Sequence, residues 1–169
     1  MGASLVADEL ARFHDLTETT LAWTRPNFFE LRYELSAPSG VLLRLSVEGI
    51  RPERHIRIDT ADRSWKIDAF PLQKRESPVF EADLPDPIAF YLGGPEPGVR
   101  LAGGETYRFR SEPPQKTVCE TSEGELVFAL ERVEFFPRWR LEMELTPRAR
   151  SLPEFPILIA CTCCSLVFG

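Results

Sequence analysis

Short stretches of alternating apolar and polar residues run through most of the chain. In FFELRYELS, residues 28–36, the side chains of Phe29, Leu31, Tyr33 and Leu35 fall on one face of an extended strand. Similar segments, rich in β-branched and aromatic residues, continue as far as RWRLEMELT. Together with LAWT near the start, they predict about twelve short strands.

The spacing between these segments limits the kind of sheet that they can form. Most of the 15 prolines fall in the gaps, and the gaps are too short for the helical crossovers that parallel strands need. IRID and SWKID flank a polar turn near Ala61–Asp62 and predict a hairpin. We therefore expect an all-β-dominated chain, folded as a closed antiparallel barrel or as a sandwich.

The N-terminal residues are predicted to form a short helix. Between residues 4 and 16, Leu5, Leu10 and Phe13 can share one helical face, and acidic residues come early. We assign residues 1–20 to an N-terminal helical segment. Residues 21–169 are assigned to a single β domain.

The C-terminal stretch FPILIACTCCSLVFG carries no charge. We predict a helix over residues 152–168, with Ser151 as its cap and Pro153 in its first turn. A helix without a polar face must be buried on all sides, in a protein core or in lipid. Only 13 residues run from Ile157 to Gly169, fewer than the roughly 20 that span a bilayer.

A barrel of about twelve strands leaves a lumen, so we expect this hydrophobic helix to fill its centre. A partner interface and shallow insertion into a membrane are the alternatives.

Charge and cysteine usage narrow the class of protein. The net charge of −6 and the isoelectric point of about 5.1 argue against binding to nucleic acid and against general attraction to anionic membranes. Asp8 and Glu9 stand where a signal peptide needs an apolar run, so a reducing, cytoplasmic location is expected.

The four cysteines lack the paired spacing of a zinc site and are interpreted as small buried residues; they are Cys119, Cys161, Cys163 and Cys164. We expect no metal and no cofactor.

Candidate chemistry is limited to cationic clusters. The chain has neither a phosphate-binding glycine loop nor a nucleophile elbow, so we expect a non-enzymatic protein without catalytic residues. Arginines suit phosphate groups because they can donate paired hydrogen bonds. The candidates for binding a lipid head group are Arg51, Arg54, Arg57, Lys74 and Arg75. The alternative interpretation is a solvated loop whose charge balances nearby acidic residues.

The order of these features resembles the tubby C-terminal-like superfamily, which includes the LURP-one-related proteins and the phospholipid scramblases. The resemblance lies in LPEFPILIA and LVF after the strand RWRLEMEL, and in the hairpin ADRSWKID with Trp65 after an acidic turn. It covers residues 21–169 and implies a twelve-stranded barrel threaded by a hydrophobic C-terminal helix. It also implies binding of phosphoinositide head groups through basic residues, although this chain is net acidic. The palmitoylated cysteines and calcium-linked acidic segment of the scramblases have no match.

The leading hypothesis is a binding or scaffold domain for a phosphoinositide, a membrane surface or a protein. A second is a thiol-based sensor or enzyme that uses Cys119 or the CTCC run, which requires a reactive thiolate with access to solvent. A third is a peripheral membrane protein held by its C-terminal apolar segment.

Overall fold

The computed structural model describes residues 10–13, 16–27, 29–50, 54–68, 76–134 and 139–168. Strands dominate, and two helices follow them, α2 (Pro147–Ser151) and α3 (Phe155–Phe168). The strands are β1 (Thr20–Thr24), β2 (Arg32–Ala37), β3 (Gly40–Glu48), β4 (His55–Thr60), β5 (Ser64–Ile67), β6 (Glu76–Glu81), β7 (Pro87–Leu92), β8 (Gly98–Leu101), β9 (Thr106–Glu112), β10 (Lys116–Thr121), β11 (Leu126–Glu134) and β12 (Arg140–Leu145).

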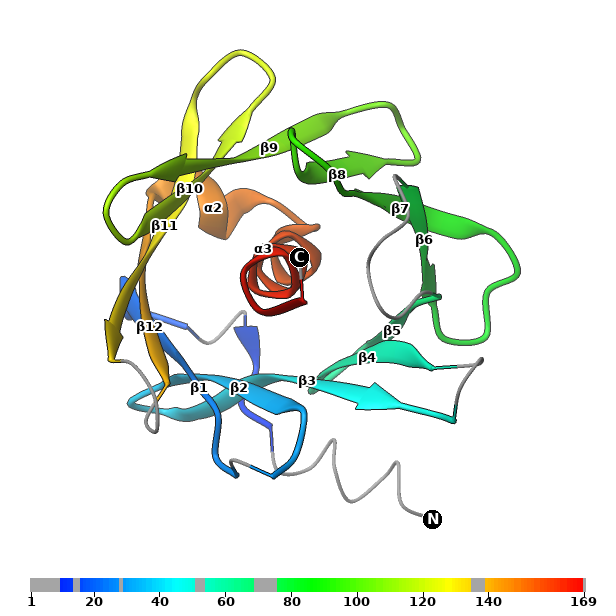
Figure 1. Cartoon of the computed structure of the whole chain (residues 1–169), viewed down its shortest axis with the longest axis horizontal. Coiled ribbons are helices and arrows are strands. Elements are labelled where there is room, and N and C mark those ends of the chain that lie inside the picture. The colour runs from blue at the N-terminus through cyan, green and yellow to red at the C-terminus, as the bar shows by residue number, and fades with distance from the viewer. Residues whose placement is uncertain are drawn as a thin grey trace.

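The strands form one closed antiparallel barrel (Figure 1). Each strand pairs with its neighbours in sequence, and β1 pairs with β12 to complete the ring, with Thr20 opposite Glu144. The predicted hairpin is present, since β4 and β5 pair from Ile56 opposite Ile67. The prediction of an all-β-dominated, twelve-stranded closed barrel is confirmed, and the sandwich is excluded.

Consecutive strands run in opposite directions, so their connections alternate between the two ends of the barrel. The β2–β3, β4–β5, β6–β7, β8–β9 and β10–β11 turns lie at the end where α2 follows β12, which we call the α2 end. The β1–β2, β3–β4, β7–β8 and β9–β10 connections lie at the other end. We call it the Phe29 end, after an exposed residue of the β1–β2 connection.

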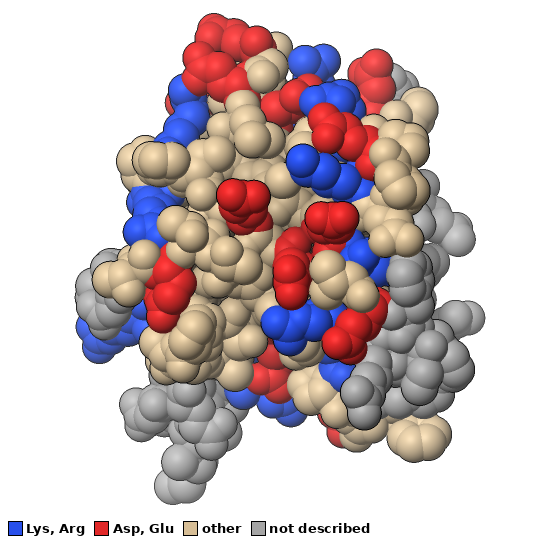
Figure 2. All heavy atoms as spheres, turned by 90° about the vertical axis from the view of Figure 1, so that its left-hand side faces the viewer, with Lys and Arg blue, Asp and Glu red and all other residues tan. Residues whose placement is uncertain are grey.

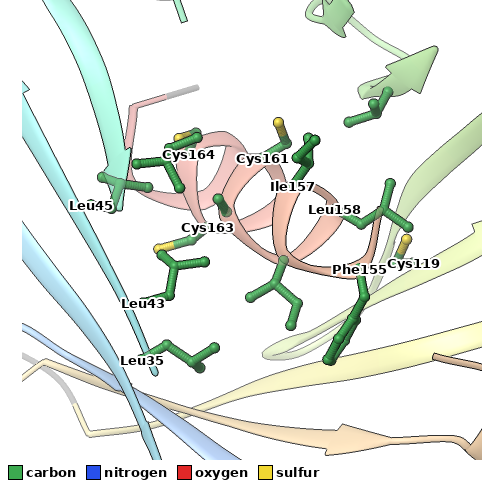
Figure 3. Packing of buried hydrophobic residues seen from close by; sticks show 14 of the residues in the cluster. Leu35, Leu43, Leu45, Cys119, Phe155, Ile157, Leu158, Cys161, Cys163 and Cys164 are labelled. Carbon is green, nitrogen blue, oxygen red and sulfur yellow. The ribbon is translucent and has the colours of Figure 1, made fainter. Parts of the chain in front are cut away.

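Strand alternation directs apolar side chains inward, as in β12, where Leu141, Met143 and Leu145 are buried and Glu142 and Glu144 are exposed. α3 lies inside the ring of strands (Figure 1). Residues 157–164 are at most 3% exposed. Figure 3 shows Cys163 pointing toward the wall formed by β2 and β3, and Cys161 pointing away from it.

The C-terminal helix begins later than the sequence predicts. Ser151 does not cap it but is the last residue of the separate helix α2, which is capped by Thr146: the Thr146 hydroxyl accepts a hydrogen bond from the Ala149 amide, with Pro147 in the first turn. Leu152 is extended, with φ −85° and ψ 122°, because a residue before proline disfavours the helical region. The helical path therefore breaks at Leu152, and α3 starts at Phe155. No helix in the described ranges is long and apolar enough to cross a bilayer.

The predicted N-terminal helix falls largely on residues outside the described ranges. The described residues 10–13 and 16–19 contain no α-helix. They do contact the barrel: the Ala11 amide donates to the Val41 carbonyl at 2.7 Å, and the ring of Phe13 packs edge-on against Phe155 with 5.6 Å between centroids.

Candidate binding surfaces

The structure describes two of the five predicted cationic residues. Arg57 lies on β4, between the inward-facing Ile56 and Ile58. Arg54 directly precedes β4 at the Phe29 end. Arg51, Lys74 and Arg75 lie outside the described residues.

Arg57 lines an outer groove over β4, β5 and the β6–β7 turn, which we call the β4–β6 groove. Two hollows of about 450 and 400 Å³ form it and share Arg57, Ser64, Glu81, Ala82, Asp83 and Leu84. Its position follows from strand alternation, because residues 57, 59, 64 and 66 point away from the core.

Carboxylates already contact the cations of this groove. The Arg57 Nε donates to Asp59 at 3.0 Å, Ser64 Oγ donates to the same carboxylate at 2.8 Å, and Glu48 lies 3.7 Å from Arg57. Burial acts to lower the pKa of Arg57, but the hydrogen bond and charge of Asp59, with those of Glu48, raise it overall. Arg57 is therefore held as a cation, and a phosphate would have to compete with Asp59 for it.

Arg63 is engaged in the same way. It forms an ion pair with Glu81, and its guanidinium lies 4.9 Å from the centroid of the Trp65 ring. Asp62 and Asp83 add negative charge to the lining. The groove is thus a mixed-charge surface rather than a basic pocket.

The face around β11 and β12 also mixes acidic and basic side chains (Figure 2). Near it, the Glu120 side chain is only 12% exposed and lies 3.9 Å from Arg108 and 3.4 Å from Arg110. The sequence reasoning missed this cluster. Alternation places both arginines on the outer face, but only the β9–β10 register brings Glu120 opposite Arg108.

All four cysteines are free thiols and buried. Burial raises the pKa of Cys161 to about 12 and raises those of Cys163 and Cys164. Burial, with smaller contributions from Cys161 and Glu120, also raises the pKa of Cys119. Because the thiolate is the reactive form, this environment opposes nucleophilic or redox chemistry.

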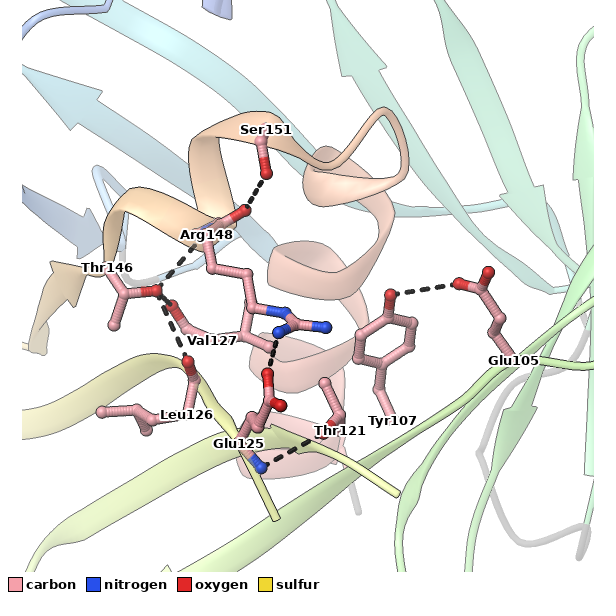
Figure 4. A network of polar contacts seen from close by, with 10 residues as sticks. Glu105, Tyr107, Thr121, Glu125, Leu126, Val127, Thr146, Arg148 and Ser151 are labelled. Atoms are coloured by element: carbon pink, nitrogen blue, oxygen red, sulfur yellow. Dashed lines mark hydrogen bonds and ion pairs between the residues drawn. The ribbon is translucent and has the colours of Figure 1, made fainter. Parts of the chain in front are cut away.

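A polar network surrounds the start of α3 at the α2 end (Figure 4). Tyr107 Oη lies 2.9 Å from a carboxylate oxygen of Glu154 and 3.3 Å from one of Glu105. Burial, then Glu154, then Glu105 raise the pKa of Tyr107, so it remains a neutral donor. Arg148 of α2 pairs with Glu125 in the β10–β11 turn. These contacts hold α2 and α3 against the strands and are structural in character.

The Phe29 end displays two large apolar side chains on adjacent connections. Phe29 is 91% exposed in the β1–β2 connection, and Ile50 is 86% exposed in the β3–β4 connection. Arg25 belongs to the first connection and Arg54 to the second. The sequence reasoning placed Phe29 on the apolar face of a strand. In the structure, Phe29 precedes β2, which starts at Arg32, and the Glu30 amide donates to the Asn27 carbonyl, as in a turn.

Within the described residues, no group of three or more histidine, cysteine or acidic side chains is placed to hold a metal ion. Comparisons with protein-family models, curated proteins and solved structures found no match for this chain.

Proposed function

We propose that this protein is a non-enzymatic binding domain that attaches to anionic membrane surfaces through the Phe29 end of its barrel. Its ligand class is the phosphorylated lipid head group, with phosphoinositides as the leading candidates. The architecture proposed with it is a tubby-like barrel in which the hydrophobic α3 serves as the core.

The distribution of charge between the two ends supports this proposal. The turns at the α2 end carry one basic residue, Arg63, and six carboxylates, namely Asp62, Asp83, Asp86, Glu105, Glu123 and Glu125, while Arg12, Arg148 and Arg150 also lie near this end. At the Phe29 end, the described residues of the β1–β2 connection carry Arg25 and Glu30, those of the β3–β4 connection carry Arg54, and those of the β7–β8 connection carry Glu96. An acidic protein can meet an anionic surface when its acidic end faces away, because interactions between exposed charges more than about 8 Å apart are largely screened at physiological salt.

The burial of residues 157–164, at most 3% exposed, favours this proposal over a membrane anchor formed by the C-terminal stretch. The raised thiol pKa values favour it over a thiol-based sensor.

Vesicle co-sedimentation tests the proposal. We expect the wild-type chain to bind phosphatidylcholine vesicles that contain a phosphoinositide, and to bind pure phosphatidylcholine far more weakly. Each basic residue near an anionic surface contributes about 1 kcal/mol, so the double variant Arg51→Glu/Arg54→Glu should bind about thirtyfold more weakly or worse. Arg57 is left unchanged because its loss would leave Asp59 without its cation.

The matched control is Arg12→Glu/Arg148→Glu, which makes the same change in net charge. Both arginines have side chains about half exposed, and both lie near the α2 end, paired with Asp62 and Glu125 respectively. Equal binding of wild type to charged and uncharged vesicles would remove the lipid form of the proposal and leave a protein partner as the ligand.

A further inference from the structure

Phe29 and Ile50 stand apart from the other exposed apolar residues. The remaining exposed large hydrophobic side chains in the described part of the chain are at most 49% exposed: Leu84, Leu126 and Val133. Exposing most of a phenylalanine and an isoleucine to water costs free energy, and neighbouring exposed apolar side chains are typical of interaction sites. Leu84 lies in the β6–β7 turn and Leu126 is the first residue of β11, both at the α2 end.

The strand register brings the two connections side by side. β2 and β3 pair with Arg32 opposite Ser46 and Tyr33 opposite Leu45. The pairing continues beyond β2, because the Val47 amide donates to the Leu31 carbonyl at 3.1 Å. Phe29 is two residues before Leu31 and Ile50 is three residues after Val47, so both leave the same edge of the barrel.

The turn that carries Phe29 is held by its own hydrogen bonds. The Phe29 amide donates to the Asn27 side-chain oxygen at 3.0 Å, and the Glu30 amide donates to the Asn27 carbonyl at 3.2 Å. Arg25 Nε donates to the Glu30 carbonyl at 3.0 Å, while its guanidinium lies 5.7 Å from the centroid of the Tyr33 ring. The outward position of Phe29 is thus built into the turn, which lowers the entropic cost of using it in binding.

The exposure of Ile50 has a different structural cause. Gly49, immediately before it, has φ +87°, a conformation that side-chain-bearing residues rarely adopt. The glycine turns the chain out of β3 and leaves Ile50 at the surface.

The geometry points to a lipid bilayer as the partner: we infer that Phe29 and Ile50 insert together into the interfacial region of an anionic membrane. This inference rests on the proposed function and identifies the contact that adds apolar binding energy to the attraction between charges. Two exposed apolar side chains with arginines on the same connections suit the boundary between lipid head groups and hydrocarbon. There the aromatic ring and the aliphatic side chain can enter the hydrocarbon while the arginines stay among the lipid phosphates. Orientation is set by the carboxylates of the α2 end, which face away from the membrane.

The first test substitutes Phe29 and Ile50 and measures partitioning onto phosphatidylcholine vesicles that contain a phosphoinositide. Phe29→Ser/Ile50→Ser should weaken binding at least tenfold, since burying either side chain even partly is worth about one factor of ten. The matched control, Leu84→Ser/Leu126→Ser, removes two exposed apolar residues from the α2 end and should bind as the wild type does. If both double variants bind as tightly as the wild type, the inference is overturned and the proposed function stands. If the wild type does not bind the vesicles, both fail together.

The second test reads insertion directly. Because the four native thiols are buried, a cysteine introduced by Phe29→Cys or Ile50→Cys is expected to react selectively with a polarity-sensitive fluorophore in the folded protein. Vesicles should shift the emission of these labels to shorter wavelength and leave a label at Leu84→Cys unchanged. Binding with no shift at either position 29 or position 50 would overturn the inference, because the protein would then attach through charge alone.

Discussion

The burial of α3 gives a quantitative prediction for Leu158→Ala. Leu158 has no solvent exposure and lies in the hydrophobic cluster that joins the helix to the barrel wall. Alanine has the best helix propensity, so the substitution preserves α3 and removes only packing. Comparable buried Leu→Ala changes cost about 3–5 kcal/mol, and the whole domain has about 5–15 kcal/mol of stability. For a chain of this size we therefore expect the melting temperature to fall by about 6–20 °C.

Urea unfolding monitored by tryptophan fluorescence is a suitable assay, because Trp23 and Trp65 are fully buried and will report the loss of the core. Leu84→Ala provides the control: its side chain is 49% exposed, and its removal should change the free energy of unfolding by no more than about 0.5 kcal/mol. A cost below about 1 kcal/mol for Leu158→Ala would mean that α3 is not packed inside the barrel in solution.

Two further predictions concern backbone packing and buried hydroxyls. Gly98→Ala should destabilise the protein by about 2 kcal/mol or more, because a Cβ there would lie 2.2 Å from the Tyr107 carbonyl oxygen, whereas Gly103→Ala has open space and should be nearly neutral in thermal melts. Burial raises the pKa values of all three tyrosines, Tyr33, Tyr91 and Tyr107. Their contribution to stability is present below pH 10, about the pKa of an unfolded tyrosine, and is lost as the pH rises through the folded values. Tyrosinate absorbance should therefore stay low at pH 10 in the native protein and be about half-maximal in urea; two or more native tyrosines titrating near pH 10 would contradict this.

The strands and their inward faces were predictable because alternation is a local property. The pattern of β12, with Leu141, Met143 and Leu145 inward, is visible in six residues. Closure of the barrel was not local, since it depends on Thr20 meeting Glu144 from the other end of the domain. Alternation alone therefore left a barrel and a sandwich open, whereas the apolar C-terminal helix and the family resemblance favoured the barrel, which the structure confirms.

The start of the C-terminal helix was misplaced although the relevant signals were present. Leu152 before Pro153 is a position that avoids helical geometry, and Thr146 followed by Pro147 is the start signal of the separate helix α2. Ser151 was chosen because the apolar run begins just after it. Hydrophobicity marks where a helix is buried, whereas capping residues and prolines mark where it begins.

For the candidate site, the contacts within one strand could be predicted and those between strands could not. Arg57 and Asp59 are two residues apart on β4. Because side chains alternate between the two faces of a strand, this spacing alone puts both on the outer face. The pairs Arg63–Glu81 and Arg110–Glu120 join different strands or turns, so they depend on how neighbouring strands are aligned. A cluster of arginines in sequence therefore says little about available positive charge until the cross-strand carboxylates are known.

The net charge of a chain does not show how its charges are distributed, for a related reason. In a barrel whose strands follow one another in order, successive turns alternate between the two ends, so the position of a turn in the chain determines the end at which its charges lie. Every second turn along the chain lies at the α2 end, and these turns carry the carboxylates of Asp62, Asp83, Glu105 and Glu123. The intervening connections lie at the Phe29 end and carry Phe29, Ile50 and Arg54. The quantity that bears on a membrane surface is thus the charge of each end rather than the total of −6.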